Sequence, residues 1–126
     1  MKRDMELVRR ILLALEEQES ITGTNPTIDG YSDEQIAYHA YLIEQAGLAN
    51  GSVVAQMESV CPEAIVTSLT WNGHEFLDLA RNETSWRKAV TGLQKKTGSI
   101  AFGALKACLT EIAKEAAKAI AGHIAS

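Results

Sequence analysis

The chain has 126 residues, enough for a single hydrophobic core but short of two ordinary domains, so we expect one domain with an appendage. Hydrophobic residues make up 46% of the chain and charged residues 22%, a balance that excludes a disordered polypeptide. The net charge is −4, and the charged residues are unevenly spread along the chain.

The N-terminal part of the chain predicts a helix and a connector. Residues 4–19 have the periodicity of an amphipathic helix, with Arg9 and Arg10 on its polar side. Residues 20–30 are rich in turn-forming side chains and are expected to form a connector with a short strand at residues 27–28. The predicted apolar arc of the helix consists of Leu7, Val8, Ile11, Leu12, Ala14 and Leu15.

A second helix is predicted to begin after Ser32, because Ser32 and Gln35 have the spacing of a capping box. The helix should end at Gly47, since glycine favours the left-handed conformation that closes helices. His39 falls on the inner side, where we expect a core histidine bonded to the backbone. The predicted buried stripe consists of Ile36, His39, Ala40, Ile43 and Ala46.

The next segment predicts a β-hairpin. A turn is expected at Asn50 and Gly51, followed by an extended run over residues 52–57. A loop around residues 61–62 then leads to a second extended run over residues 65–69. Two extended runs joined in this way form an antiparallel pair of strands.

Three further helices complete the predicted secondary structure. Thr70 is expected to cap the first of them, and Thr84 or Ser85 the second. Gly98 should break the chain before a last helix over residues 99–125.

The sequence predicts no catalytic or metal-binding site. Cys61 and Cys108 lack the spacing of metal ligands and are expected to be reduced thiols. Trp71 and Trp86, near the starts of two helices, are expected in the core, with ligand stacking as the alternative. No nucleophile, base and oxyanion site come together, so we expect a non-enzymatic protein without a cofactor. The histidines, which also lack metal-ligand spacing, are His39, His74 and His123.

Neither secretion nor membrane insertion is predicted. The N-terminal residues include Lys2 and Arg3 but no apolar stretch with a small-residue cleavage site. Charged residues such as Glu111 and Lys114 interrupt the Ala- and Ile-rich region near the C-terminus. We therefore expect a cytoplasmic protein without membrane contact.

The order of these elements, helix, connector, helix, hairpin and helix, is that of a winged-helix domain. We expect a mainly α winged-helix domain with a small antiparallel wing over residues 1–82, and a long helical extension over residues 83–126. Residues 29–48 resemble the recognition-helix region of small winged-helix regulators, in which an Ala-Gly-Leu turn leads into the wing.

A narrower resemblance covers most of the chain. It rests on the segments Met1-Lys-Arg-Asp-Met-Glu-Leu7, Gly30-Tyr-Ser32, Tyr38-His39, Ala46-Gly-Leu48 and Leu69-Thr-Trp-Asn-Gly-His-Glu-Phe-Leu-Asp78. In these segments the chain resembles a family of short proteins of uncharacterised function from bacteria and their phages, which begin Met-Lys-Arg-Asp-Met. The resemblance implies a winged-helix fold and a phage or prophage association, and it supplies no catalytic residues.

The charge distribution disfavours DNA binding by the predicted recognition helix and wing. Between Arg10 and Arg81 the chain has no lysine or arginine, the residues on which DNA affinity mainly depends. The outer face of the second helix carries two tyrosines framed by carboxylates, which favours a basic protein partner. The alternative is a solvated helix face whose tyrosines pack against the wing. The predicted partner-binding residues are Asp33, Glu34, Tyr38, Tyr41, Glu44 and Gln45.

The last predicted helix indicates a homodimer. At ~1.5 Å per residue it would be about 40 Å long, more than a winged helix needs to cover its own core. Part of its apolar stripe should therefore meet another chain. The alternative is that it folds back on the first helix near Leu13. The predicted dimerisation residues are Leu105, Leu109, Ile112, Ala116 and Ile120.

These patterns predict a non-enzymatic, macromolecule-binding protein of phage or prophage type. Its expected partner is a protein, and inhibition of a host nucleic-acid-handling or defence complex would fit an acidic surface. The runner-up is a small DNA-binding transcriptional regulator that uses basic residues near both ends of the chain. Because the predicted reading surfaces lack lysine and arginine, we expect duplex DNA to be bound weakly and without sequence preference, if at all. A structural subunit of a larger assembly is the third alternative.

Overall fold

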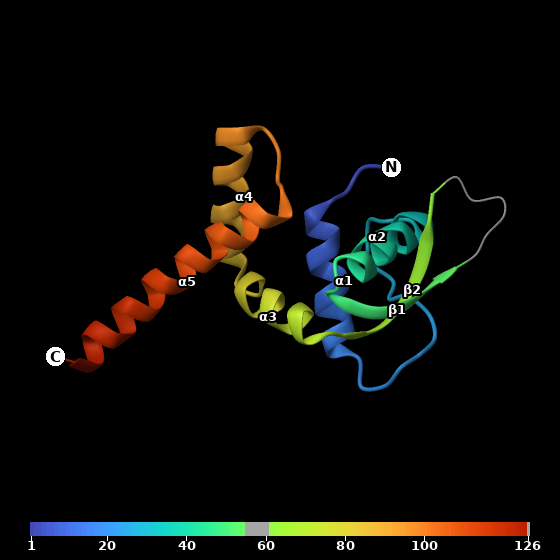
Figure 1. Cartoon of the computed structure of the whole chain (residues 1–126), viewed down its shortest axis with the longest axis horizontal. Helices are drawn as coiled ribbons and strands as arrows, with labels where there is room; N and C mark the ends of the chain where they lie inside the picture. The colour runs from blue at the N-terminus through green and yellow to red at the C-terminus, as the bar shows by residue number, and fades with distance from the viewer. Residues whose placement is uncertain (55–60, 126) are drawn as a thin grey trace. The chain divides into compact units, whose positions relative to one another are not determined.

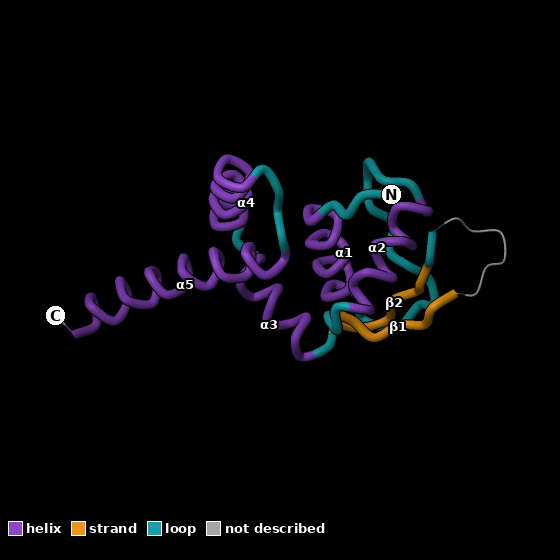
Figure 2. Tube along the Cα trace, turned by 45° about the horizontal axis from the view of Figure 1, so that its top comes forward, coloured by secondary structure: helices purple, strands orange, loops and turns teal. Residues whose placement is uncertain are grey.

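The computed structural model describes residues 1–54 and 61–125. These residues are mainly helical, with five helices and one antiparallel sheet of two strands (Figures 1 and 2). The chain forms two compact units, unit 1 (Met1–Leu77) and unit 2 (Asp78–Ser126), which divide inside α3. The elements are α1 (Met5–Glu17), α2 (Asp33–Gln45), β1 (Ala49–Val54), β2 (Glu63–Leu69), α3 (Trp71–Ala80), α4 (Glu83–Thr97) and α5 (Phe102–Ala125).

Helix α1 begins at an aspartate cap. The carboxylate of Asp4 accepts hydrogen bonds from the backbone amides of Glu6 at 2.9 Å and Leu7 at 3.3 Å. The predicted apolar arc is confirmed, because five of its six members are buried and Ala14 is half-buried. The prediction for Arg9 is wrong: its side chain is buried, with the guanidinium 3.6 Å from the carboxylate of Glu6.

Helix α2 packs against α1 and against both strands of the hairpin (Figure 1). Its predicted capping box at Ser32 and Gln35 is present. The predicted end at Gly47 is confirmed as well, since this residue has a φ of 75°. The amide of Gly47 donates to Glu44 O and that of Leu48 donates to Ile43 O, which is the Schellman pattern of a closed helix end.

The hairpin is present, but its first strand begins earlier than predicted. Ala49 pairs with Leu69 at one end of the ladder and Val54 pairs with Glu63 at the other. The predicted turn at Asn50 and Gly51 is wrong, because both residues lie within β1. A register shift lies between them, because Asn50 pairs with Ser68 and Gly51 pairs with Val66, which leaves Thr67 of β2 as the extra residue. Residues 55–57 of the predicted run lie outside the described residues.

The connector between α1 and α2 contains no strand at residues 27–28. A single side chain meets the edge of β2 instead. Asn25 Nδ2 donates to Ala64 O at 2.8 Å, and the amide of Val66 donates to Asn25 Oδ1 at 2.9 Å. The amide side chain thus pairs with β2 as a neighbouring strand would, and it satisfies backbone groups that a strand edge leaves open.

Helix α3 is held against the end of α2. The hydroxyl of Thr70 accepts from the amide of Gly73 at 3.0 Å, which confirms the predicted cap, and it donates to Gly47 O. The amide of Thr70 donates to Leu48 O at 3.1 Å. A Cβ added at Gly73 would overlap that same carbonyl oxygen, so the close approach of the two segments requires glycine.

The prediction that Trp71 belongs to the core is wrong, since 79% of its surface is exposed. Helical spacing explains the exposure. The buried face of α3 in unit 1 contains Phe76 and Leu77, whereas Trp71 shares the opposite face with the exposed His74 and Glu75.

Unit 2 contains α4 and α5, which contact each other. Asn82 caps α4 by accepting a hydrogen bond from the amide of Ser85 at 2.9 Å, so the predicted cap at Thr84 or Ser85 is wrong. The predicted break at Gly98 is confirmed by its left-handed conformation. The core prediction for Trp86 is also confirmed, because only 3% of its surface is exposed.

Candidate functional site

The six predicted partner-binding residues all belong to α2 or its end, but they differ in exposure. Asp33, Glu34 and Gln45 are exposed. Tyr38 and Tyr41 are half-buried: the ring of Tyr38 meets that of His39 edge-on, and Tyr41 accepts a hydrogen bond from Gln45 Nε2 at 2.7 Å. Glu44 is half-buried as well. The outer face of α2 is therefore partly open.

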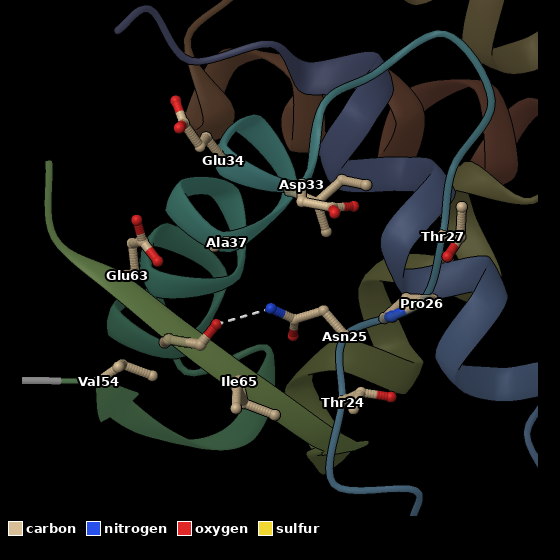
Figure 3. A pocket seen from close by; sticks show the side chains of 12 residues that line it. Thr24, Asn25, Pro26, Thr27, Asp33, Glu34, Ala37, Val54, Glu63 and Ile65 are labelled. Atoms are coloured by element: carbon tan, nitrogen blue, oxygen red, sulfur yellow. Dashed lines mark hydrogen bonds between the residues drawn. The ribbon is translucent and has the colours of Figure 1, made fainter. Parts of the chain in front are cut away.

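A hollow of about 490 Å³ lies beside the first turns of α2 (Figure 3). We call it the α2 hollow. Its floor and walls come from the connector, from α2 and from the paired ends of β1 and β2. Figure 3 shows the side chain of Asn25 directed to β2 at its edge. The hollow is lined by Thr24, Asn25, Pro26, Thr27, Asp33, Glu34, Ile36, Ala37, Val54, Glu63, Ala64 and Ile65.

The α2 hollow combines apolar and acidic side chains. Asp33, Glu34 and Glu63 contribute carboxylates, while Val54 and Ile65 contribute apolar surface. Two of the carboxylates lie in the first turn of α2, where they also stabilise the positive end of the helix dipole. The hollow shares Asp33 and Glu34 with the predicted partner-binding face, so the two features form one continuous surface.

The electrostatic setting of this surface is negative. Unit 1 contains 4 basic and 12 acidic residues, which gives a net charge of −8 with histidine neutral. Its basic residues are all at positions 2–10. A positively charged ligand would therefore be attracted to the α2 hollow, and a phosphate backbone would be repelled.

The predicted core histidine is confirmed. His39 is 1% exposed, and its Nε2 accepts a hydrogen bond from the backbone amide of Asp4 at 2.8 Å. Because the carbonyl of Gln35 can only accept, Nδ1 must carry the proton that bonds to it at 2.8 Å. Both ring nitrogens are thus occupied: Nε2 joins α2 to the start of α1, and Nδ1 bonds within α2.

Tyr31 also forms a hydrogen bond with Asp4. Its hydroxyl donates to the carboxylate of Asp4 at 3.0 Å. Burial, followed by this hydrogen bond, raises the pKa of Tyr31 above its usual value. Asp4 therefore caps α1 and binds Tyr31 and His39, and these side chains serve the packing of unit 1.

The described residues offer no metal centre, since none of their His, Cys, Asp and Glu side chains gather in groups of three or more that could hold an ion. Cys61 and Cys108 are both half-buried, and they form no disulfide with each other. Within the same described part of the chain, no helix is both long and apolar enough to cross a bilayer.

The predicted dimerisation residues on α5 differ in how far they are exposed. Leu105 and Leu109 are already buried within the chain, so in this conformation they are not open to a second chain. Ile112 is half-buried, and Ala116 is exposed. Ile120 is 62% exposed, so the accessible part of the stripe lies toward the C-terminal end of the helix.

Sequence reasoning found the acidic face of α2 but missed the α2 hollow. Asn25 and Ala64, which are hydrogen-bonded across its edge, are 39 positions apart in the chain. No local pattern links such distant residues. The exposure of Trp71, by contrast, had a sequence signal in the polar residues spaced three and four positions after it.

Comparison with known proteins places the chain in a family. Residues 2–99 match the family described as hypothetical protein (DUF2513). A protein of Haemophilus influenzae (strain ATCC 51907 / DSM 11121 / KW20 / Rd), described as an uncharacterized protein, is 34% identical over 108 residues, which cover 84% of this chain and 90% of the relative. No solved structure matches the chain. The chain therefore belongs to the DUF2513 family.

Proposed function

We propose that the chain is a non-enzymatic protein-binding module, and that the α2 hollow with the outer face of α2 receives a basic segment of a partner protein. The observation that carries this proposal is the hollow itself. It offers about 490 Å³ beside Asp33, Glu34 and Glu63, in a unit with a net charge of −8.

The composition of the hollow suits a lysine or arginine side chain. Such side chains lay an aliphatic stem along apolar surface and keep the charged head among polar groups. Val54 and Ile65 supply apolar surface, and the carboxylates supply hydrogen-bond acceptors. Tyr38 and Tyr41, each half-buried on the adjoining helix face, add aromatic contact area. The partner is thus a basic segment whose cationic side chains enter the hollow.

A winged-helix architecture is part of the proposal. It is supported by a helix that ends at Gly47 and leads directly into an antiparallel hairpin. In a DNA-binding winged helix the helix before the wing would carry basic residues, whereas α2 carries Asp33 and Glu34 at its start. An acidic surface of this kind could occupy the DNA-binding groove of a host nucleic-acid-handling or defence complex. The phage or prophage association rests on the resemblance alone.

Unit 2 supports a second candidate function. It contains 8 basic and 4 acidic residues, a net charge of +4. Lys88 and Lys95 are exposed and lie on one face of α4, seven positions apart. A transcriptional regulator that contacts DNA through this unit is therefore the alternative. The homodimer remains a proposal as well, supported by the exposed Ala116 and Ile120 on α5.

Two titrations test the primary proposal. The natural chain should bind a short arginine-rich peptide at near-physiological salt and should bind duplex DNA weakly and without sequence preference. Glu34→Lys should weaken the peptide affinity about tenfold or more, because it replaces an attraction by a repulsion at the rim of the hollow. Glu17→Lys is the matched control, since Glu17 is exposed in the same unit and does not line the hollow.

The outcomes separate the two candidates. Equal losses in Glu34→Lys and Glu17→Lys would mean that only the overall charge matters, and the α2 site would be abandoned. Sequence-specific DNA binding tighter than about 10⁻⁸ M would establish the regulator instead.

A further inference from the structure

Helix α4 has lysines whose charge is not offset by an acidic neighbour. Lys88, Lys95 and Lys96 are exposed, and among the residues that the structure describes no carboxylate forms an ion pair with any of them. Lys95 and Lys96 lie in the last turn of α4, where they stabilise the helix dipole, but Lys88 lies well before that turn. On α5, by contrast, Lys118 Nζ is 3.8 Å from Glu115 Oε1. The lysines of α4 are therefore open to a negatively charged partner.

These lysines lie on the side of α4 that faces away from its buried residues. Lys88, Thr91 and Lys95 are all exposed and follow one another at three- and four-residue spacing, so they share one face of the helix. The opposite, buried face consists of Trp86, Ala89 and Leu93. At ~1.5 Å per residue, the stretch from Lys88 to Lys95 spans about 10 Å along the helix axis. The carboxylate of α4 belongs to Glu83, which forms an ion pair with Arg87. Helix α4 thus presents a row of positive charge on a rigid element.

Two carboxylates of the α2 hollow lack basic neighbours in the same way. Asp33 and Glu34 are exposed, and in the described part of the chain no lysine or arginine forms an ion pair with either. The basic residues of unit 1 are confined to positions 2–10. Unit 1 has a net charge of −8 and unit 2 a net charge of +4, so the acidic unit of one copy attracts the basic unit of another.

We propose that the basic segment bound by the α2 hollow is α4 of a second copy of this chain, with Lys88 and Lys95 directed toward carboxylates that include Asp33 and Glu34. This inference rests on the proposed function and names the partner. The contact is heterologous, because the α2 surface of one copy meets the α4 surface of the next. The charges involved are exposed, so salt screens the attraction and weakens the association.

Sedimentation velocity of the natural chain tests the association. The sedimentation coefficient should rise with protein concentration at low salt and return to that of a monomer at high salt. Lys88→Glu should weaken the association about tenfold or more, because it replaces an attraction by a repulsion. Lys118→Glu is the matched control: it changes the net charge of unit 2 by the same amount, at a lysine that is already paired with Glu115. The control should associate nearly as the natural chain does.

Mixing two variants tests whether the two surfaces meet. Glu34→Lys and Lys88→Glu should each associate poorly alone, because each has lost one of the two surfaces. An equimolar mixture should form a complex of one chain of each kind, since the first variant keeps the α4 surface and the second keeps the α2 surface. A mixture of Glu17→Lys and Lys118→Glu, which carries the same changes of charge elsewhere, should behave as the natural chain does. Circular dichroism of each variant confirms that the helices are intact.

A natural chain that stays monomeric at high micromolar concentration and low salt would overturn this choice of partner. If that chain still bound the arginine-rich peptide and Glu34→Lys reduced the affinity, the proposed function would stand. Association that is unchanged in Lys88→Glu but lost in Ile120→Asp would assign the contact to α5 instead. A monomeric chain that binds duplex DNA tightly, and loses this binding in Lys88→Glu, would assign the α4 surface to nucleic acid.

Discussion

The two units of this chain have opposite charge, and the polar contacts that can be compared between them differ in reach. Unit 1 has a net charge of −8 and unit 2 a net charge of +4, a difference that the net charge of −4 conceals. Unit 1 has hydrogen bonds between distant positions, as between Asp4 and His39 or between Asn25 and Ala64. In unit 2 the ion pair between Glu83 and Arg87 joins exposed neighbours on one helix.

This difference indicates how each unit responds to substitution. A contact between distant segments holds two elements in register, and its loss leaves buried groups without partners. A contact between exposed neighbours on a helix is screened by water and contributes little. Substitutions at polar or close-packed positions should therefore destabilise unit 1 far more than unit 2.

The largest effect is expected from Gly73→Ala. The added Cβ would overlap the carbonyl oxygen of Leu48, so α3 must move away from the end of α2. We expect the free energy of unfolding, measured by urea denaturation, to fall by about 3 kcal/mol. Gly92→Ala in α4 is the control. Its Cβ meets nothing within 4 Å, so it should stabilise the chain by up to about 1 kcal/mol. Equal effects of the two substitutions would refute the prediction that unit 1 is more sensitive to substitution than unit 2.

His39→Ala should have the next largest effect. It removes the acceptor of the Asp4 amide and the donor to Gln35 O, and it leaves a cavity at a fully buried position. A loss of about 2–3 kcal/mol in the free energy of unfolding is expected. His74→Ala, at an exposed position of the same unit, should change it by less than about 0.5 kcal/mol. Similar losses in both variants would show that the hydrogen bond between Asp4 and His39 contributes little to the stability of unit 1.

Tyr31→Phe should have a smaller effect that depends on pH. Removal of the hydroxyl deletes the hydrogen bond to Asp4 and should cost about 1 kcal/mol at neutral pH. Because the folded chain raises the pKa of Tyr31 above 10.0, the folded state favours the protonated phenol. Its contribution is therefore complete below the pKa of the unfolded chain and is lost as pH rises through the raised value.

Urea denaturation of the natural chain and of Tyr31→Phe at a series of pH values tests this loss of stability at high pH. The stability difference between the natural chain and Tyr31→Phe should be constant near neutral pH and should shrink above about pH 10. A difference that grows in alkaline solution would contradict the assigned hydrogen bond.

The smallest effect is expected in unit 2. Arg87→Ala removes the ion pair with Glu83, whose atoms are 3.0 Å apart but whose side chains are both exposed. The free energy of unfolding should change by less than about 0.5 kcal/mol. A loss as large as that of His39→Ala would mean that unit 2 also depends on specific polar contacts.

Local sequence patterns predicted some helix ends correctly and others wrongly. The capping box of Ser32 and Gln35 and the closure at Gly47 were predicted correctly, because each involves residues within one turn of the helix. The cap of α4 was not, since Asn82, Thr84 and Ser85 all favour caps and stand close together. Choosing among them requires knowledge of where the preceding helix ends.

The hairpin shows a different limit. Asn50 and Gly51 have the composition of a tight turn, but pairing of the chain with β2 extends the strand through both residues. The competing interaction comes from residues 66–68, which are too distant for a local pattern to register. Tertiary pairing therefore overrode the turn preference.

The sequence by itself determined the five helices, the antiparallel hairpin, the buried His39 and the negative charge around α2. All of these depend on residue spacing and composition along the chain. Only the tertiary structure decided which surfaces are open: it buried Leu105 and Leu109, left Ile120 exposed, and formed the α2 hollow. The physical reason is that exposure and cavities depend on which distant segments pack together, and helical or strand periodicity does not specify that choice.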